Sequence, residues 1–181
     1  YLWLGTGEGL CRFDGFNFVN EFKGDSLPDS PVMESYKDSK GRVWFGYDNG
    51  QIALLRGLEI KLITPPEDHL NSINGIVENA DGEMIFATQN KGLIRIDQEF
   101  ELSYYQEGLG NQFISAINLT SGGDLLLGTF DGLFLYRFSE TGDELELAGR
   151  FDEIPYTNIQ LIIPARDENS YWIGTKDEGL Y

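Results

Sequence analysis

The chain has 181 residues, of which 41% are hydrophobic and 13% aromatic, enough for one domain with a buried core and few for two. Thirteen Lys and Arg residues against thirty Asp and Glu residues give a formal net charge of −17, which repels nucleic acid and other polyanions. No stretch approaches 18 consecutive apolar residues, so the sequence predicts no membrane span and no direct membrane contact from this segment.

The residue types favour short strands joined by tight turns. Glycine occurs 22 times, beside 12 Phe, 9 Tyr and 3 Trp; glycine tolerates positive φ, and aromatic side chains favour pleated surfaces. The single cysteine, Cys11, lies in an apolar run and indicates a buried thiol, with no internal disulfide. Tyr1 begins inside a strand-like pattern, so any targeting or anchoring segment is expected outside this sequence.

One short strand-like phrase recurs along the chain. Its occurrences are Tyr1–Thr6, Val43–Tyr47, Met84–Thr88, Leu125–Thr129 and Tyr171–Thr175. The small residue within it recurs every 41 residues from Gly5 to Gly46, Ala87 and Gly128, and after 46 residues at Gly174. A fixed period of this length is typical of repeat proteins.

Each unit is predicted to contain four strands. A turn and a strand opening on glycine follow each phrase, and an apolar run ending in a turn precedes it. A more variable fourth strand is expected at residues 16–22, 59–63, 100–105 and 145–151. The repeat units are centred on residues 1–14, 42–55, 83–97, 124–136 and 170–181 of a single segment, 1–181. The longer last interval comes from the turn at residues 139–144, where a repeat fold tolerates insertion.

Four antiparallel strands in about 40 residues match one blade of a β-propeller. The runs 125–127 and 133–136 are apolar on both faces, as expected when each sheet lies between two others. The fold class predicted is all-β, an arc of about five blades with the first and last incomplete; a β-solenoid is the alternative. Residues at repeating positions are expected to pack the blades together. They are Trp3, Gly5, Trp44, Gly46, Ala87, Gly128, Trp172 and Gly174.

The composite phrase, Asp-x-x-Gly-x-x-Trp-hydrophobic-Gly-Thr-x-x-x-Gly-Leu, resembles the two-component regulator propeller repeat. The segments 38–51 and 167–180 fit it well, 81–93 replaces the Trp by Ile85 and the Gly by Ala87, and 122–133 lacks the Asp and the Trp. The resemblance implies part of the periplasmic sensor region of a bacterial hybrid histidine kinase, a class of sensor that often responds to glycans. It also implies that the remaining propeller blades or a second copy complete the arc.

Few residues suggest catalysis. His69 is the only histidine, in a turn after Pro65 and Pro66, with no other ligands at metal spacing. We therefore predict no catalytic residue, metal or cofactor, which weakens a resemblance to propeller lyases of the streptogramin-inactivating type. Asp38, Asp81 and Asp167 are expected to cap turns rather than bind Ca²⁺.

Function is expected where the units differ, in loops that converge on the propeller axis. The segments entering the first strand of each unit carry amides and hydroxyls that could hydrogen-bond an oligosaccharide, with one tyrosine as a stacking face. The candidates are Asp29, Asn71, Asn74, Asn111, Gln112, Ser115, Tyr156, Asn158 and Gln160. The alternative is that these side chains only satisfy backbone groups of turns.

Three functions remain open. A non-enzymatic sensor segment is the first, with a ligand that biases a pre-existing arrangement of the protein. A propeller that binds proteins through its rim and edge strands is the second. A lyase or hydrolase is the third. Convergent polar groups would favour the first, an exposed apolar patch the second, and acidic or histidine groups around a metal the third.

Overall fold

A computed structural model describes residues 1–19, 27–109, 113–154, 158–167 and 170–181. Over these residues the chain forms 17 β-strands and one short 3₁₀ helix, η1 (Glu67–His69), which confirms the all-β prediction. The strands fall into two compact units, Tyr1–Ile73 and Asn74–Tyr181, and each unit is described by itself.

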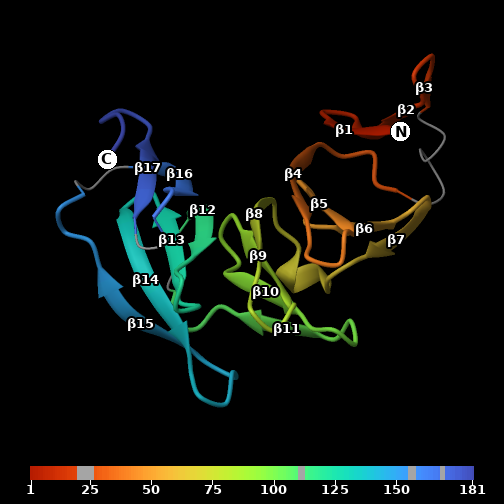
Figure 1. Ribbon diagram of the computed structural model, residues 1–181. Helices are drawn as coiled ribbons and strands as arrows, with labels where there is room; N and C mark the ends of the chain where they lie inside the picture. Colours follow the sequence, from red (N-terminus) through yellow and green to blue (C-terminus); the bar gives the residue numbers. More distant parts are fainter. Residues whose placement is uncertain (20–26, 110–112, 155–157, 168–169) are drawn as a thin grey trace. The chain divides into compact units, whose positions relative to one another are not determined.

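The first unit contains two antiparallel sheets in chain order (Figure 1). One has the order β1-β2-β3 and the other the order β4-β5-β6-β7. Their strands are β1 (Leu2–Thr6), β2 (Gly9–Phe13), β3 (Phe18–Val19), β4 (Val32–Lys37), β5 (Val43–Tyr47), β6 (Ile52–Arg56) and β7 (Glu59–Ile63). The predicted fourth strand at 16–22 corresponds to the short β3, and its residues 20–22 lie outside the described part.

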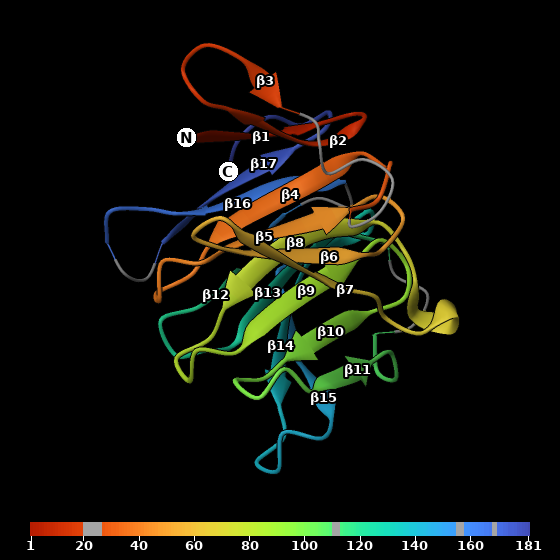
Figure 2. The ribbon, with the colours of Figure 1, turned by 90° about the vertical axis from the view of Figure 1, so that its right-hand side faces the viewer.

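The second unit contains two four-stranded sheets and one two-stranded sheet. Figure 2 shows β8 to β11 side by side in chain order. The strands are β8 (Ile73–Glu78), whose first residue ends the first unit, β9 (Met84–Thr88), β10 (Leu93–Ile96), β11 (Leu102–Tyr105), β12 (Ile114–Leu119), β13 (Leu125–Thr129), β14 (Gly132–Phe138), β15 (Leu145–Arg150), β16 (Ile159–Pro164) and β17 (Tyr171–Thr175). Each recurring phrase is therefore the second strand of its sheet, or the first where the sheet starts at β1.

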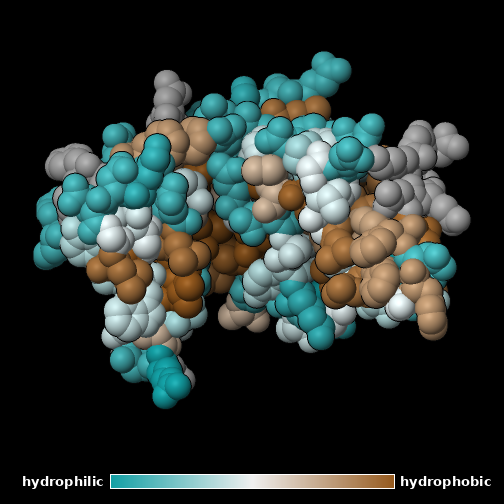
Figure 3. Space-filling model, turned by 90° about the horizontal axis from the view of Figure 1, so that it is seen from above, coloured by the Kyte–Doolittle hydropathy of each residue, from teal (hydrophilic) through white to brown (hydrophobic). Residues whose placement is uncertain are grey.

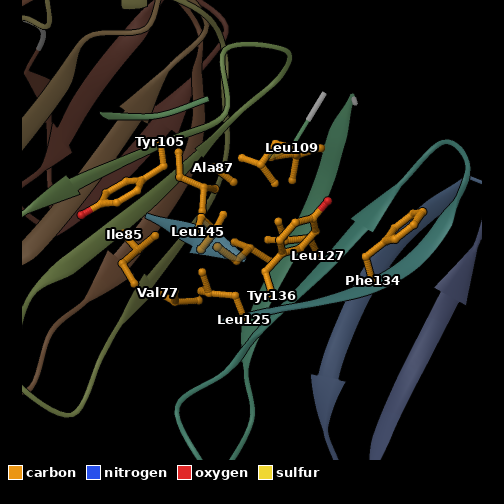
Figure 4. Close-up of a cluster of buried hydrophobic side chains, with 13 residues drawn as sticks. Val77, Ile85, Ala87, Tyr105, Leu109, Leu125, Leu127, Phe134, Tyr136 and Leu145 are labelled. Carbon is orange, nitrogen blue, oxygen red and sulfur yellow. The ribbon is translucent and has the colours of Figure 1, made fainter. Parts of the chain in front are cut away.

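Sheet β12–β15 buries both of its faces. Leu125 and Leu127 point to a cluster with Ile85 and Ala87 of sheet β8–β11 (Figure 4), whereas Leu126 packs with Ile162 and Ile173 of sheet β16–β17. Each such leucine contributes roughly 1.5–3 kcal/mol when fully buried. Two covered faces explain why the strand sequence is continuously apolar instead of alternating.

Neighbouring sheets meet at a small residue of the phrase. A Cβ atom added at Gly5 would lie 2.8 Å from Val32 Cγ1, one at Gly46 would lie 2.6 Å from Ile73 Cβ, and one at Gly128 would lie 2.6 Å from Ile159 Cγ2. Each contacting side chain is the β-branched first residue of the next sheet's first strand. The glycine thus leaves a notch that a valine or isoleucine of the following sheet fills, and we call this contact the glycine notch.

The hairpin after the phrase is closed by a threonine hydroxyl. In four sheets it donates to a glycine carbonyl at 2.7–3.0 Å and accepts a backbone N–H of the turn; these residues are Thr6, Thr88, Thr129 and Thr175. In sheet β4–β7 the position is Tyr47, whose ring is fully buried with Leu10 and Leu27. Burial raises the pKa of Tyr47 to about 12, so its hydroxyl stays neutral at physiological pH.

A buried carboxylate organises the turn before β5. Asp38 Oδ2 accepts hydrogen bonds from Arg42 Nε at 2.5 Å and Trp44 Nε1 at 2.9 Å, while Oδ1 accepts the Arg42 backbone N–H at 2.8 Å. Burial by itself raises the pKa of Asp38, but these donors and the Arg42 charge outweigh it and leave the pKa below 3.8.

The equivalent capping residue before β9 is Asn79, which corrects the prediction that Asp81 holds this role. Asn79 Oδ1 accepts the backbone N–H groups of Asp81 and Glu83 at 3.1 and 2.9 Å. The turn closes from Asn79 N–H to the Glu83 carbonyl, just as Asp38 N–H bonds to the Arg42 carbonyl. An amide caps this turn as well as a carboxylate does, so the more conspicuous Asp-x-Gly sequence misplaces the cap by two residues.

We predict that Gly128→Ala destabilises the protein by about 1–3 kcal/mol, because the new methyl group overpacks the glycine notch filled by Ile159. Gly149→Ala on β15 is the matched control, since its Cβ would meet only Leu135 Cβ at 4.0 Å. Denaturant unfolding measures both. Equal stability of the two variants would show that the notch does not constrain sheet packing.

We predict that Asp38→Ala costs about 3 kcal/mol, because it leaves the buried Arg42 guanidinium without its carboxylate. Asp124→Ala removes a comparable pair to the exposed Arg137 and should cost less than about 1 kcal/mol. The lowered pKa means that the Asp38 contribution is present at neutral pH and is lost as pH falls below 3.8 through the folded-state value. Urea titrations at pH 7 and at pH 3 test both statements; a difference that grows on acidification would contradict them.

Candidate functional site

Three of the predicted binding residues occupy one structural position in the second unit. Asn74, Ser115 and Gln160 are each the second residue of the first strand of a sheet, on β8, β12 and β16. On β12 and β16 the strand register shifts at this point, between Ile114 and Ala116 and between Ile159 and Leu161. A bulge leaves the extra residue outside the ladder and redirects its side chain.

Two of these side chains connect consecutive sheets. Asn74 Nδ2 donates to the backbone carbonyl of Ile114 at 2.9 Å, and Ser115 Oγ hydrogen-bonds the carbonyl of Ile159. The acceptors are equivalent, because each is the first residue of the next sheet's edge strand. An edge strand presents unpaired carbonyl groups, and these donors satisfy one in each case. Binding of a ligand by Asn74 and Ser115 remains a prediction.

Further along the same edges, two more polar side chains make similar links. Asn118 Nδ2 donates to the Ile162 carbonyl and the Tyr171 hydroxyl donates to the Leu119 carbonyl, both at 3.0 Å. Side-chain bonds therefore follow the joint between β12–β15 and β16–β17 over its length. The first strands of these two sheets, which we call the inner edge, are therefore joined by polar contacts as well as by apolar packing.

The last sheet offers a different environment. Gln160 is exposed, whereas Asn158 is half-buried. The backbone carbonyl of Asn158 accepts the Lys176 N–H at 3.0 Å, and its Oδ1 is buried without a hydrogen-bond partner among the described residues. Gln160 can therefore reach a ligand in solution directly, and Asn158 offers a buried acceptor beside it.

The candidates of the first unit lie before β4 and β8. Asp29 is exposed, and the neighbouring Ser30 hydroxyl is buried and accepts the Asn49 N–H at 3.2 Å. Asn71 is half-buried, and its backbone packs against Gly50, which has φ +84°. A side chain at Gly50 would collide with that backbone, so the hairpin glycine shapes the segment that enters β8.

One charged residue of this edge was not among the candidates. Glu34 on β4 pairs with the phrase glycine Gly46. In the later sheets the residue that pairs with the phrase glycine is uncharged: Ala116 opposite Gly128, and Leu161 opposite Gly174. Although much of its side chain is exposed, partial burial raises the pKa of Glu34. Aligning the first strands by their β-branched start would have revealed it as a carboxylate at an otherwise uncharged position.

Asn111, Gln112 and Tyr156 lie outside the described residues, and their binding roles remain predictions. His69 ends η1, half-buried, with Nε2 3.7 Å from Asp68 Oδ2. Within the described residues no group of three or more His, Cys, Asp and Glu side chains is placed to hold a metal ion. Nor does any helix there have the length and hydrophobicity needed to span a membrane.

On the face that Figure 3 presents, hydrophilic residues are interspersed with patches of hydrophobic residues. The exposed large apolar side chains include three on the last sheet, Leu161, Ile163 and Trp172. Acidic residues give the chain its net charge of −17. An uncharged or cationic ligand therefore meets less electrostatic resistance than an anionic one.

Antiparallel four-stranded sheets in chain order, packed face to face within each unit, define a β-propeller segment. Solved structures show the same fold. The extracellular domain of BT4673 from B. thetaiotaomicron, described in two structures as a putative one-component system and a putative hybrid two-component system, matches with a TM-score of 0.75 at 22% and 20% identity. The match covers 98% of this chain and 25% of that chain in both cases.

A catalytically inactive His-to-Ala variant of virginiamycin B lyase from Staphylococcus aureus, solved with quinupristin, matches with a TM-score of 0.65 at 20% identity, over 95% of this chain and 61% of the lyase. No protein-family model and no curated protein matches the sequence. The structural matches confirm the predicted propeller fold. This chain spans a quarter of the BT4673 chains.

We predict that Ser115→Ala lowers the free energy of unfolding by about 1 kcal/mol, because it leaves the edge carbonyl of Ile159 without its side-chain donor. Gln160→Ala is the matched control at the equivalent position; since Gln160 is exposed, the change should stay within about 0.5 kcal/mol. Urea unfolding of both variants decides. A larger loss of unfolding free energy for Gln160→Ala than for Ser115→Ala would contradict the view that Ser115 joins two sheets and Gln160 does not.

Proposed function

We propose that this chain is a non-catalytic, ligand-sensing propeller segment in the extracytoplasmic part of a two-component sensor. The observation that carries the proposal is its likeness to the BT4673 extracellular domain over 98% of its residues. The repeat phrase Asp-x-x-Gly-x-x-Trp supports it independently, because Asp38, Gly41 and Trp44 form the hydrogen-bonded turn before β5. A periplasmic location follows from the same proposal.

The ligand class that fits best is a neutral oligosaccharide. The exposed candidate residues Asp29 and Gln160 are polar, and carboxylates and amides hydrogen-bond sugar hydroxyls. The net charge disfavours sulfated and other polyanionic glycans.

Thermal-shift measurements test this function on the 181-residue chain. The probes are neutral oligosaccharides of xylan, arabinan, mannan and β-glucan, with a heparin oligosaccharide as the polyanionic control. A ligand of the native state raises the melting temperature with its concentration, so we expect a saturable rise with one neutral class and none with heparin. Gln160→Ala and Asp29→Ala should each be tested for loss of that rise, with Ser121→Ala as an exposed control outside the candidate set.

No rise with any neutral probe would refute glycan sensing by this chain alone, and a rise with heparin only would refute the expected charge preference. In either case a propeller that binds protein partners becomes the better proposal, since exposed apolar side chains such as Trp172 are present. Light scattering on the same samples shows whether a shift comes from ligand binding or from a change in association.

A lyase is the second candidate function, because the virginiamycin B lyase structure covers 95% of this chain. That variant is inactive through loss of a histidine, and this chain has only His69, on a turn beside Asp68. We expect no conversion of quinupristin when it is incubated with the protein and followed by chromatography. Conversion of quinupristin that His69→Ala abolishes would favour the lyase instead.

A further inference from the structure

Two phenylalanines depart together from the repeat in sheet β12–β15. Phe130 directly follows the hairpin threonine, and Phe113 directly precedes Ile114, the β-branched start of β12. In the other units the residue at the first position is Gly7, Asp48, Gln89 or Lys176, and the residue at the second is Pro31, Ser72 or Asn158. This sheet alone has an aromatic residue at both positions, and we call Phe113 and Phe130 the phenylalanine pair.

The two rings of the pair stack on each other. Their centroids are 4.0 Å apart and their planes differ by 18°. The same two positions are cross-strand neighbours in other sheets, because the Asp48 N–H donates to the Pro31 carbonyl at 2.9 Å and the Lys176 N–H donates to the Asn158 carbonyl at 3.0 Å. The pair therefore continues the ladder between β12 and β13, where cross-strand aromatic contacts are favourable.

The pair is not explained by packing of the interior. Phe130 is 47% exposed, and Phe113 is half-buried. Tyr47, which replaces the hairpin threonine of an earlier sheet, is by contrast fully buried and packs with Leu10 and Leu27. A ring that stays half in water at a hairpin gains less from burial than one in the core. This departure from the repeat thus points to an exposed aromatic surface with a use in binding.

The sheet before the pair places amide groups beside it. The Ile114 backbone N–H donates to the Gln89 carbonyl at 3.0 Å. Since Ile114 directly follows Phe113, Gln89 lies next to the pair. Gln89 is half-buried, and the following Asn90 is exposed. Amide side chains both donate and accept hydrogen bonds, so this side of the pair suits a ligand rich in hydroxyl groups.

The sheet after the pair places a cation near it. The Ile159 side chain fills the glycine notch at Gly128, two residues before Phe130. In that following sheet Lys176 holds the position equivalent to Phe130 and is exposed. Sheets packed face to face lie about 10 Å apart. Gln89, Phe130 and Lys176 therefore form a row of the length of an oligosaccharide rather than of a single sugar.

The chemistry of an aromatic platform selects among neutral sugars. The face of a phenyl ring carries partial negative charge and attracts the weakly positive C–H groups of a sugar. Glucose and xylose in β-linked chains have equatorial ring substituents, so both faces of each ring present C–H groups. Mannose has an axial hydroxyl and the arabinose of arabinan is a furanose, so neither has two such faces. The net charge of −17 disfavours acidic sugars.

We propose that the phenylalanine pair is the stacking platform for one ring of a β-linked glucose or xylose oligosaccharide, and that Gln89 and Lys176 hydrogen-bond the sugar rings on either side. The assignment rests on the proposed sensing of neutral oligosaccharides and names the sugar class and the residues that contact it. Phe130 presents its exposed ring to the sugar, and Phe113 holds that ring in place before the ligand arrives, which lowers the entropic cost of binding.

Isothermal titration calorimetry of the 181-residue chain tests the platform with cello- and xylo-oligosaccharides as probes and a manno-oligosaccharide for comparison. We expect Phe130→Leu to weaken binding about tenfold, because it keeps an apolar side chain and removes the ring. Phe130→Tyr keeps the ring and should bind like the unaltered protein. Phe16→Ala is the matched control, since it removes a 92% exposed phenylalanine from another turn and should leave the affinity unchanged.

Saturation-transfer NMR gives a direct readout of the stacking. Saturation of the aromatic protons of the protein should pass to the axial C–H protons of the bound sugar in the unaltered chain and in Phe130→Tyr, and should be lost in Phe130→Leu. Lys176→Met keeps a long side chain without the ammonium group and should weaken binding by a few-fold, as expected for one hydrogen bond. Circular dichroism checks that each variant is folded.

The outcomes separate this proposal from the function on which it rests. If the unaltered chain binds a neutral oligosaccharide and Phe130→Leu binds it equally well, the platform is wrong and oligosaccharide sensing stands. Preference for the manno-oligosaccharide would overturn the sugar class, and equal losses in Phe130→Leu and Phe130→Tyr would contradict ring stacking. If no neutral oligosaccharide binds the unaltered chain, the proposed function fails and the platform fails with it.

Discussion

The contact between a phrase glycine and a β-branched residue of the next sheet sets the spacing of this fold. Val32 against Gly5 in the first unit and Ile159 against Gly128 in the second bring backbone and side chain closer than any Cβ would allow. Since interiors are close-packed and resist small volume changes, such a contact fixes the distance between two sheets at their inner ends. The larger apolar side chains toward the outer strands fill the widening space, as Tyr105, Tyr136 and Leu145 do in Figure 4.

Close approach of the sheets at their inner ends shields backbone carbonyl groups of the first strands from water. The first strand of every complete sheet is an edge strand, so its outward carbonyls need partners wherever the neighbouring sheet excludes water. Asn74 and Ser115 supply them, aided on β12 by a bulge that turns the side chain out of the ladder. A polar side chain that bonds the next sheet in this way is not available to a ligand. A ligand therefore has to bind polar side chains that make no such bond.

The sequence predicted the features that recur in every repeat unit. The 41-residue interval, the small residue at its centre and the apolar runs on both faces lead to four-stranded sheets packed against each other, because only burial on two sides explains such runs. It was less informative at turns. Asn79 rather than Asp81 caps the turn before β9, since the cap depends on the closing backbone bond from Asn79 to Glu83 and not on the most acidic residue. Spacing also cannot tell that a bulge aims Ser115 at Ile159, or that Glu34 takes an otherwise uncharged place.

The positions that depart from the repeat locate the features specific to this chain. Tyr47 replaces the hairpin threonine and fills the core of the first unit, so this departure serves packing. Glu34 introduces a carboxylate with a raised pKa at the inner edge, and Gln160 presents an exposed amide at the place where Asn74 and Ser115 bond the next sheet. A fold shared by a sensor domain and a lyase does not by itself determine function. Function therefore depends on such departures from the repeat, Gln160 among them, and not on the glycine and apolar positions that pack the sheets together.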